Sequence, residues 1–192
     1  MKFKIFKYKK VKSTNDIAMS LIKKKNTVGF IRADIQTKGR GQHGKKWISK
    51  GGNLFATIFF PLKKNYPKFS EFSLINAIII SNIIKIFCKK KEISFKWPND
   101  IFINKKKICG ILQETIVFNN KKFIIIGIGI NVTSNPIALS KYKATNILFE
   151  TNKKYEVSKI AKLIIKSYKS FLSNLKNYDY SKFKKKSEIM AL

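Results

Sequence analysis

Apolar residues recur along this chain with two different periods, and the periods predict which segments are strands and which are helices. Over the first ten residues, apolar side chains alternate with lysines, as on a half-buried strand. Ser13-Thr14-Asn15-Asp16 then offers several N-cap side chains, and Ile17 to Ile22 repeats apolar residues at helical spacing. The clearest amphipathic helix runs from Val157 to Leu175.

Other segments are mainly apolar, which predicts further strands and a helix in the core of the fold. Val28 to Ile35 and Leu54 to Phe60 have the composition of strands, whereas Phe69 to Phe87 is apolar on more than one face and long enough for a core helix. Four further strands are expected over 93–95, 101–103, 108–118 and 123–130, with hairpin turns at Asn104-Lys105 and Asn119-Asn120. A meander is the simplest pairing of these four. The order of elements favours an α+β fold with a mixed, mainly antiparallel sheet covered by helices.

Length and charge limit the broad class of protein. A chain of 192 residues with 44% hydrophobic residues predicts one domain with one sizeable core. Its formal net charge of +31 would point to a nucleic-acid partner, but the lysines are spread over the whole chain and only Arg32 and Arg40 could make bidentate base contacts. We therefore expect no specific nucleic-acid partner. The lysines at 182–187 are interpreted as a basic tail.

Cysteine usage and the apolar stretches bear on compartment. Cys88 and Cys109 lie in apolar surroundings without CxxC spacing, and the chain has one histidine, so the sequence predicts two buried, reduced thiols and no zinc site. Met1 to Lys10 lacks the apolar region of a secretory signal. Leu74 to Phe87 is interrupted by polar residues and is too short to cross a bilayer. We expect a cytoplasmic protein without a membrane partner.

Two glycine patterns suggest phosphate-binding motifs that the sequence does not complete. Gly39 to Lys45 matches GxxxxGK, but Lys46 stands where a P-loop requires Ser or Thr, and a strand follows. Gly127-Ile128-Gly129 begins a dinucleotide pattern, but Val132 replaces the third glycine. The segment Gly39–Trp47, called the glycine-basic loop below, still has the glycines and cations suited to closing over an anion, with a solvated surface loop as the alternative.

A second cationic segment begins at Lys96, 57 residues after the start of the glycine-basic loop. In Lys96-Trp97-Pro98-Asn99-Asp100, proline holds Trp97 extended and Asn99-Asp100 favours a turn, which alone could be structural. Lys107-Ile108-Cys109-Gly110-Ile111-Leu112 follows shortly after. The two lysines that bracket this turn, together with the glycine-basic loop, suggest a site for a carboxylate and a nucleotide.

Five segments occur in the order and approximate spacing found in biotin protein ligases. They are Ser13 to Asn15, Gln36 to Gly41, Lys96 to Asp100, Lys107 to Glu114 and Gly127 to Asn131. From about Phe6 to Glu150, the chain resembles the catalytic domain of that family. The resemblance implies a fold like that of class II aminoacyl-tRNA synthetases. It also implies ATP-dependent ligation of biotin to a lysine of the biotin carrier domain of a biotin-dependent carboxylase, through biotinyl-5′-adenylate.

The resemblance also implies roles for individual residues. Lys107 and Arg40 would be catalytic, with Lys107 at the biotin carboxylate and the acyl phosphate. Biotin would contact Ser13, Thr14, Asn15, Gln36, Arg40, Gly41, Gln42, Lys107 and Gly110, and the nucleotide would contact Lys96, Asp100 and Asn131. Asp100 would also be a magnesium ligand. ATP with magnesium and biotin would be substrates, with no permanently bound cofactor, and a homodimer is compatible with this interpretation. Trp47 would pack over the ligand or anchor the loop in the core.

The chain departs from the family pattern in two ways, at Gln42 and in the domains that it is expected to contain. Gln42 stands where many members carry arginine near the adenylate, although Lys45 or Lys46 could supply that charge. We expect residues 1–192 to form a single catalytic domain without an N-terminal DNA-binding domain or a small C-terminal β-domain. The alternatives are a lipoate or octanoyl transferase on the same fold and a basic nucleic-acid-binding module.

Overall fold

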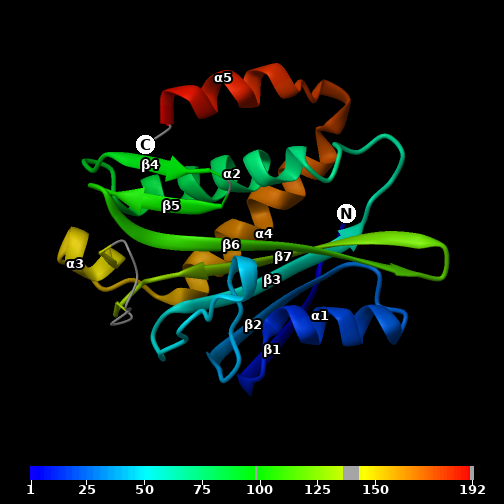
Figure 1. Ribbon diagram of the computed structural model, residues 1–192, viewed down its shortest axis with the longest axis horizontal. Coiled ribbons are helices and arrows are strands. Elements are labelled where there is room, and N and C mark those ends of the chain that lie inside the picture. The colour runs from blue at the N-terminus through cyan, green and yellow to red at the C-terminus, as the bar shows by residue number, and fades with distance from the viewer. Residues whose placement is uncertain (98, 136–142, 191–192) are drawn as a thin grey trace.

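Seven strands form one mixed sheet in the order β1-β2-β3-β7-β6-β5-β4 (Figure 1). The computed structural model describes residues 1–97, 99–135 and 143–190. The strands are β1 (Lys4–Val11), β2 (Gly29–Gln36), β3 (Leu54–Pro61), β4 (Ile93–Lys96), β5 (Asp100–Ile103), β6 (Lys106–Phe118) and β7 (Lys121–Ile130). β1 pairs with β2 in parallel and the other neighbours pair antiparallel, which confirms the expected α+β class.

The last four strands form the meander that the sequence predicts. β4 pairs with β5, β5 with β6, and β6 with β7, each antiparallel. Both predicted hairpin turns are present, and their residues Asn104, Lys105, Asn119 and Asn120 have φ between 47° and 62°. Asparagine tolerates this left-handed backbone better than most residues, which explains its use at both turns.

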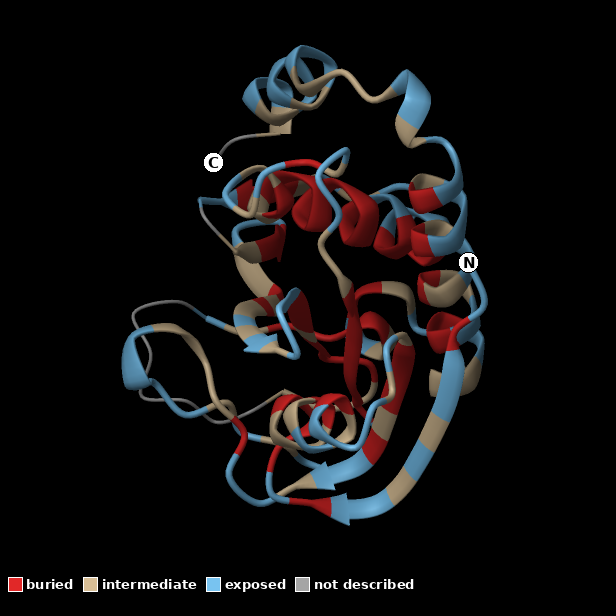
Figure 2. Ribbon diagram, turned by 90° about the vertical axis from the view of Figure 1, so that its right-hand side faces the viewer, coloured by how far each residue is buried: buried red, intermediate tan, exposed pale blue. Residues whose placement is uncertain are grey.

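Helices cover both faces of the sheet. The helices are α1 (Thr14–Lys23), α2 (Glu71–Phe87), α3 (Ile147–Thr151), α4 (Val157–Ser173) and α5 (Tyr180–Met190), with short 3₁₀ turns at Gln42–Gly44 and Leu175–Asn177. α1 packs on one face, whereas α2 and α4 pack on the other and α5 lies outside α2 (Figure 1). Most of α2 is therefore buried, as its apolar composition predicts (Figure 2).

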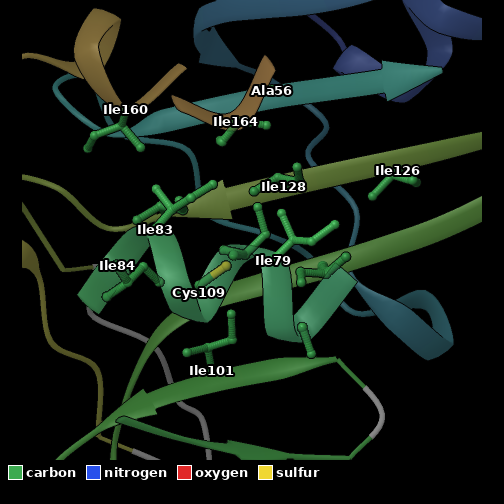
Figure 3. Close-up of a cluster of buried hydrophobic side chains, with 14 of the residues drawn as sticks. Ala56, Ile79, Ile83, Ile84, Ile101, Cys109, Ile126, Ile128, Ile160 and Ile164 are labelled. Atoms are coloured by element: carbon green, nitrogen blue, oxygen red, sulfur yellow. The ribbon is translucent and has the colours of Figure 1, made fainter. Parts of the chain in front are cut away.

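Aliphatic side chains fill the larger core, between the sheet and α2 and α4. Figure 3 shows part of it, with Ile79, Ile83 and Ile84 of α2, Ile160 and Ile164 of α4, and Ala56, Ile101, Cys109, Ile126 and Ile128 of the strands. A smaller core beneath α1 joins Ala18 and Ile22 to Ile31, Phe59 and Ile125. The two cores use alternate residues of the same strands, so each strand has one face toward α1 and the other toward α2.

The prediction of a basic tail at 182–187 is wrong, because these residues lie within α5. Phe183 packs at 6.0 Å from the ring of Phe171 and at 5.7 Å from that of Tyr178, while the lysines around it remain exposed. These contacts of Phe183 therefore pack the helix against the rest of the fold, although the sequence here looks like a lysine run. α3 was not predicted either; it begins after Asn146, whose side chain accepts a hydrogen bond from the Phe149 amide at 2.8 Å.

Both cysteines are buried, as predicted. Burial raises the pKa of the Cys88 thiol to about 11 and that of Cys109 well above its ordinary value. Both thiols are therefore protonated near neutral pH. None of the helices in the described parts of the chain combines the length and the apolar surface that crossing a bilayer requires.

A chain of buried polar groups ties α4 and α2 to β6. Tyr168, which is completely buried, donates its hydroxyl to Asn76 Oδ1 at 2.8 Å. Asn76 in turn donates to Gln113 Oε1 at 2.9 Å, and Gln113 donates to the Phe69 carbonyl at 2.6 Å. Each polar group is satisfied by the next, so removing one leaves its neighbour buried and unpaired.

We predict that Tyr168→Phe lowers the free energy of unfolding by about 1–2 kcal/mol, because Asn76 Oδ1 then loses its buried donor. Urea denaturation measures the change. The matched control is Tyr8→Phe, which removes a hydroxyl from a half-exposed tyrosine on β1 and should change stability by less than about 0.5 kcal/mol. Equal effects of the two substitutions would contradict the importance of this buried chain.

Candidate active site

One cavity of about 900 Å³ brings together every site residue predicted from the sequence. Its walls come from the start of α1, the end of β2, the glycine-basic loop, the β4–β5 turn and the strands β6 and β7. The predicted residues that line it are Ser13, Thr14, Asn15, Gln36, Arg40, Gly41, Gln42, Lys96, Asp100, Lys107, Gly110 and Asn131. Segments almost 120 residues apart thus meet at one site. Their individual roles remain predictions.

Two glycines on neighbouring strands leave the sheet without side chains at the floor of the cavity. Gly110 of β6 is paired directly opposite Gly129 of β7. A Cβ atom on Gly110 would lie 2.6 Å from the Trp47 ring, and one on Gly129 would lie 2.6 Å from its indole nitrogen. The two glycines therefore form the seat on which Trp47 rests. Trp47 thus lines the cavity and anchors the glycine-basic loop, while its packing over a ligand stays a prediction.

A β-bulge turns Lys107 toward the cavity. Ile101 pairs with Cys109 and Phe102 with Lys107, so Ile108 is an extra residue in β6. Ile108 and Cys109 are consecutive, yet both are buried in the larger core. Without the bulge, strand alternation would place Lys107 on the same face as Cys109, toward that core. Because of the bulge, Lys107 instead lies on the same face of β6 as Gly110, toward the cavity.

Interactions of both its backbone and its side chain fix Lys107 in place. Its amide donates to the Lys143 carbonyl at 2.8 Å, and its carbonyl accepts from the Thr145 amide at 2.9 Å. Its ammonium lies 2.7 Å from Asp100 Oδ2 and 5.5 Å from the centre of the Trp47 ring. The Lys107 side chain is 27% exposed and that of Asp100 21%, so the pair is partly shielded from water. The lysine is therefore fixed at the cavity wall.

The first turn of α1 presents polar groups that are already arranged by their neighbours. Ser13 is the N-cap residue, but its side chain makes no capping bond, contrary to the interpretation of this segment as a self-capping start. Gln36 Oε1 instead accepts from the Thr14 amide at 2.8 Å and from its hydroxyl at 3.0 Å. The buried hydroxyl of Thr57 lies 2.8 Å from Thr14 Oγ1 and donates to Asn15 Oδ1 at 2.6 Å.

Arg40 is paired with two carboxylates. One terminal nitrogen of its guanidinium donates to Asp16, and the other lies 3.0 Å from both carboxylate oxygens of Glu114. Burial acts to lower the pKa of Arg40, but the hydrogen bonds and charges of Asp16 and Glu114 outweigh it and raise the pKa overall. Asn15 also donates to Glu114 Oε2 at 2.6 Å, so Glu114 joins the loop to α1.

The glycine-basic loop forms a small hairpin. Arg40 and Lys46 are bridged in antiparallel fashion, and the Trp47 amide donates to the Gly39 carbonyl at 2.9 Å. At the tip, His43 and Gly44 have φ of 53° and 71°, and the second of these is readily adopted by glycine. The loop leads into β3 and not into a helix, in agreement with the rejection of a P-loop. Gln42, Lys45 and Lys46 all line the cavity.

The β4–β5 turn and the end of β7 complete the wall. Asn99 donates its side-chain amide to the Ile111 carbonyl at 2.9 Å, which fixes the turn on β6. Trp97 is 59% exposed at the cavity rim; Pro98, which was expected to hold it extended, lies outside the described residues. Asn131 is buried and donates to the Thr145 carbonyl at 3.0 Å.

Four residues of the site went unrecognised from the sequence. The sequence marks Asp16 only as a candidate N-cap residue and Glu114 only as the end of a motif, and it gives no signal for Thr57 or Ser49. Ser49 accepts from Gln36 Nε2 at 3.0 Å, so the Gln36 side chain is bound at both its oxygen and its nitrogen. These residues act on other side chains and not on the cavity itself, so sequence patterns gave no reason to select them.

This chain is similar in sequence to known protein ligases. The Biotin/lipoate A/B protein ligase family matches residues 8–131. The bifunctional ligase/repressor BirA of Escherichia coli is 32% identical over 124 residues, which cover 64% of this chain and 38% of that protein. The biotin–[acetyl-CoA-carboxylase] ligase of Paracoccus denitrificans is 27% identical over 128 residues, covering 66% of this chain and 53% of that protein. The chain thus matches about half or less of these relatives' length.

Solved structures share the whole fold. A biotin protein ligase from Aquifex aeolicus, in complex with biotin and ATP, is 30% identical with a TM-score of 0.81, covering 100% of this chain and 79% of that one. The ligase from Leishmania major in complex with biotinyl-5-AMP has a TM-score of 0.85 at 24% identity, covering 100% of this chain and 83% of that one. The second likeness concerns the fold alone.

We predict that Gly129→Ala unseats Trp47, because the new methyl group occupies the position of the indole, and that the overpacking costs about 1–3 kcal/mol of stability. In a Trp97→Phe background Trp47 is the remaining tryptophan, and its fluorescence emission should shift to the red as water reaches the ring. Gly51→Ala is the control, since nothing lies within 4 Å of its added methyl group. An unshifted emission in Gly129→Ala would contradict this seat.

Proposed function

Because this chain belongs to the Biotin/lipoate A/B protein ligase family, we propose that it joins biotin to ATP and transfers the biotinyl group to a lysine of a biotin carrier domain. The observation that carries the proposal is the convergence of every predicted site residue, from five separate segments, on one cavity of about 900 Å³. A cavity of this size suits a nucleotide and a second small molecule together.

The cavity has the two kinds of surface that biotin requires. Trp47 and Leu112 supply an apolar wall for the ring carbons and the aliphatic chain. Ser13, Thr14 and Gln36 supply the hydroxyl and amide groups suited to the ureido ring, which has two donors and one acceptor. The lipoyl ring offers no such donors, so this polar set favours biotin over the lipoate alternative.

In the first step, an oxygen of the biotin carboxylate attacks the α-phosphorus of ATP. The bond from this phosphorus to the bridging oxygen breaks, and pyrophosphate leaves. Two anions must approach each other, so a fixed cation lowers the barrier by offsetting their repulsion and stabilising the transition state. Lys107 is suited to this role because its backbone is bound on both sides and the bulge directs it into the cavity. No covalent enzyme intermediate is needed.

Lys96, Asp100 and Asn131 would lie at the nucleotide. Asp100 is the one carboxylate among the described residues that line the cavity. A single carboxylate fits magnesium that arrives with ATP, because Mg²⁺ is commonly bound by one or two carboxylates together with substrate phosphates and water. The ion would neutralise phosphate charge. Asp100 is also the partner of Lys107, so it would hold the metal close to the catalytic lysine.

In the second step, the neutral amine of a carrier lysine attacks the acyl carbon of biotinyl-5′-adenylate. The bond between this carbon and the phosphate oxygen breaks, AMP leaves, and the nitrogen loses a proton to form the amide. The same lysine, Lys107, would stabilise the negative charge on the leaving phosphate. The macromolecular partner under this proposal is therefore a carrier domain that presents one exposed lysine.

We predict that the purified protein, given biotin, ATP with magnesium and an active carrier domain from the same cell, yields one biotinylated lysine. Mass spectrometry of the carrier measures the product. Lipoate in place of biotin should give little modification. Modification by lipoate at an equal rate, or none by either acid, would contradict the proposal.

Lys107→Ala should slow biotin-dependent ATP–pyrophosphate exchange by about 10²–10³-fold, because the transition state loses its fixed cation. Lys162→Ala removes an exposed lysine of α4 away from the cavity and is the matched control, expected to retain full activity. Thermal unfolding of both variants checks that they are folded. Exchange at the unchanged rate in Lys107→Ala would refute the role of this lysine.

A further inference from the structure

Glu114 lies at the junction of two parts of the cavity wall that belong to different elements. Its Oε2 atom accepts from Asn15 Nδ2 of α1 at 2.6 Å and from Arg40 of the glycine-basic loop at 3.0 Å, and its Oε1 atom accepts from Arg40 at 3.0 Å. Asp16 binds the other terminal nitrogen of the same guanidinium. We call Arg40, Asp16 and Glu114 the Arg40 cluster.

The charges in the Arg40 cluster do not suit binding of an anion. One guanidinium faces two carboxylates, so the cluster has a formal charge of −1, and both terminal nitrogens of Arg40 already have acidic partners. An approaching phosphate or carboxylate would have to displace them against their repulsion. Lys107 differs, because its ammonium is paired with the single carboxylate of Asp100.

Asn15 is similarly occupied. Its amide donates to Glu114, and its carbonyl oxygen accepts from Thr57 at 2.6 Å. A Cβ atom on Gly127 would lie 2.6 Å from this same oxygen, so the glycine leaves room for the Asn15 side chain. With its acceptor oxygen used and its position enclosed, Asn15 is suited to shaping the pocket.

We propose that Glu114 is a positioning residue of the biotin pocket, which holds Asn15 in its orientation and fastens the glycine-basic loop over the cavity through Arg40. This inference deepens the proposed function, on which its catalytic consequences rest. The Arg40 side chain is then a fastening for the loop, and its neighbour Gly41 also lines the cavity. Lys107 remains the cation that faces the reacting anions.

Limited trypsin digestion of the ligand-free protein tests the fastening without reference to activity. Glu114→Gln keeps the size of the side chain but removes its charge, so the loop should open more often and be cut after Lys45 and Lys46 about fivefold faster than in the wild type. Cleavage after Lys89 and Lys90, between α2 and β4, should stay unchanged in the same digests. Glu156→Gln, an exposed glutamate at the start of α4, is the charge control and should match the wild type. Equal cleavage of the loop in Glu114→Gln would overturn the fastening.

Kinetics then separate positioning from catalysis. In biotin-dependent ATP–pyrophosphate exchange, Glu114→Gln and Arg40→Gln should each raise KM for biotin about tenfold while changing kcat less than about threefold. The double variant should be no worse than Arg40→Gln alone, because both substitutions release the same contact. A hundredfold loss of kcat confined to Arg40→Gln would overturn the proposal and make Arg40 a catalytic residue. If the wild type shows no exchange with biotin, the proposed function fails, while the trypsin result still decides whether the fastening exists.

Discussion

The site depends on the register between β6 and β7. This register places Gly110 opposite Gly129 and Leu112 opposite Gly127, so one face of the sheet loses side chains at three neighbouring positions. Trp47 fills the gap at the first pair, and Asn15 occupies the space beside Gly127. A shift by one residue would turn these glycines toward α2 and present isoleucines to the cavity. The loop and α1 would then have nowhere to pack.

The packing of Trp47 and Asn15 on the sheet also explains why β7 contains a glycine pattern that resembles a dinucleotide-binding motif. Gly127-Ile128-Gly129 begins like a dinucleotide-binding turn, but it lies inside β7, where both neighbours are paired strands. Its glycines are required because two large side chains approach the sheet, whereas Ile128 points the other way, into the core shared with α2. Alternation along a strand thus produces a G-x-G spacing without any phosphate-binding turn.

Periodicity and turn chemistry predicted most of the fold, because the apolar runs are long and the turns are marked by asparagine. They failed at α5, where the contacts of Phe183 with Phe171 and Tyr178 stabilise a segment that looks like a lysine run in the sequence, and at the short α3. The resemblance selected the residues that line the cavity, but not how they are held. The bulge at Ile108, the capping of α1 by Gln36 and the contacts of Glu114 each join residues distant in sequence, and single-segment patterns contain no information on such pairs.

The location of charge says more about function than its total. Among the described residues that line the cavity, Arg40, Lys45, Lys46, Lys96 and Lys107 are cationic and Asp100 is the one carboxylate. These cations are not equivalent, because Arg40 is paired with both Asp16 and Glu114, whereas Lys45 and Lys46 are exposed at the hairpin tip. A cation held between two carboxylates, like Arg40, stabilises the fold of the loop, whereas exposed lysines attract anions from solution. Under the proposed function, the exposed lysines would attract the nucleotide triphosphate to the cavity in which Lys107 lies, while the neutral ring of biotin would be recognised by groups whose hydrogen bonds are already set.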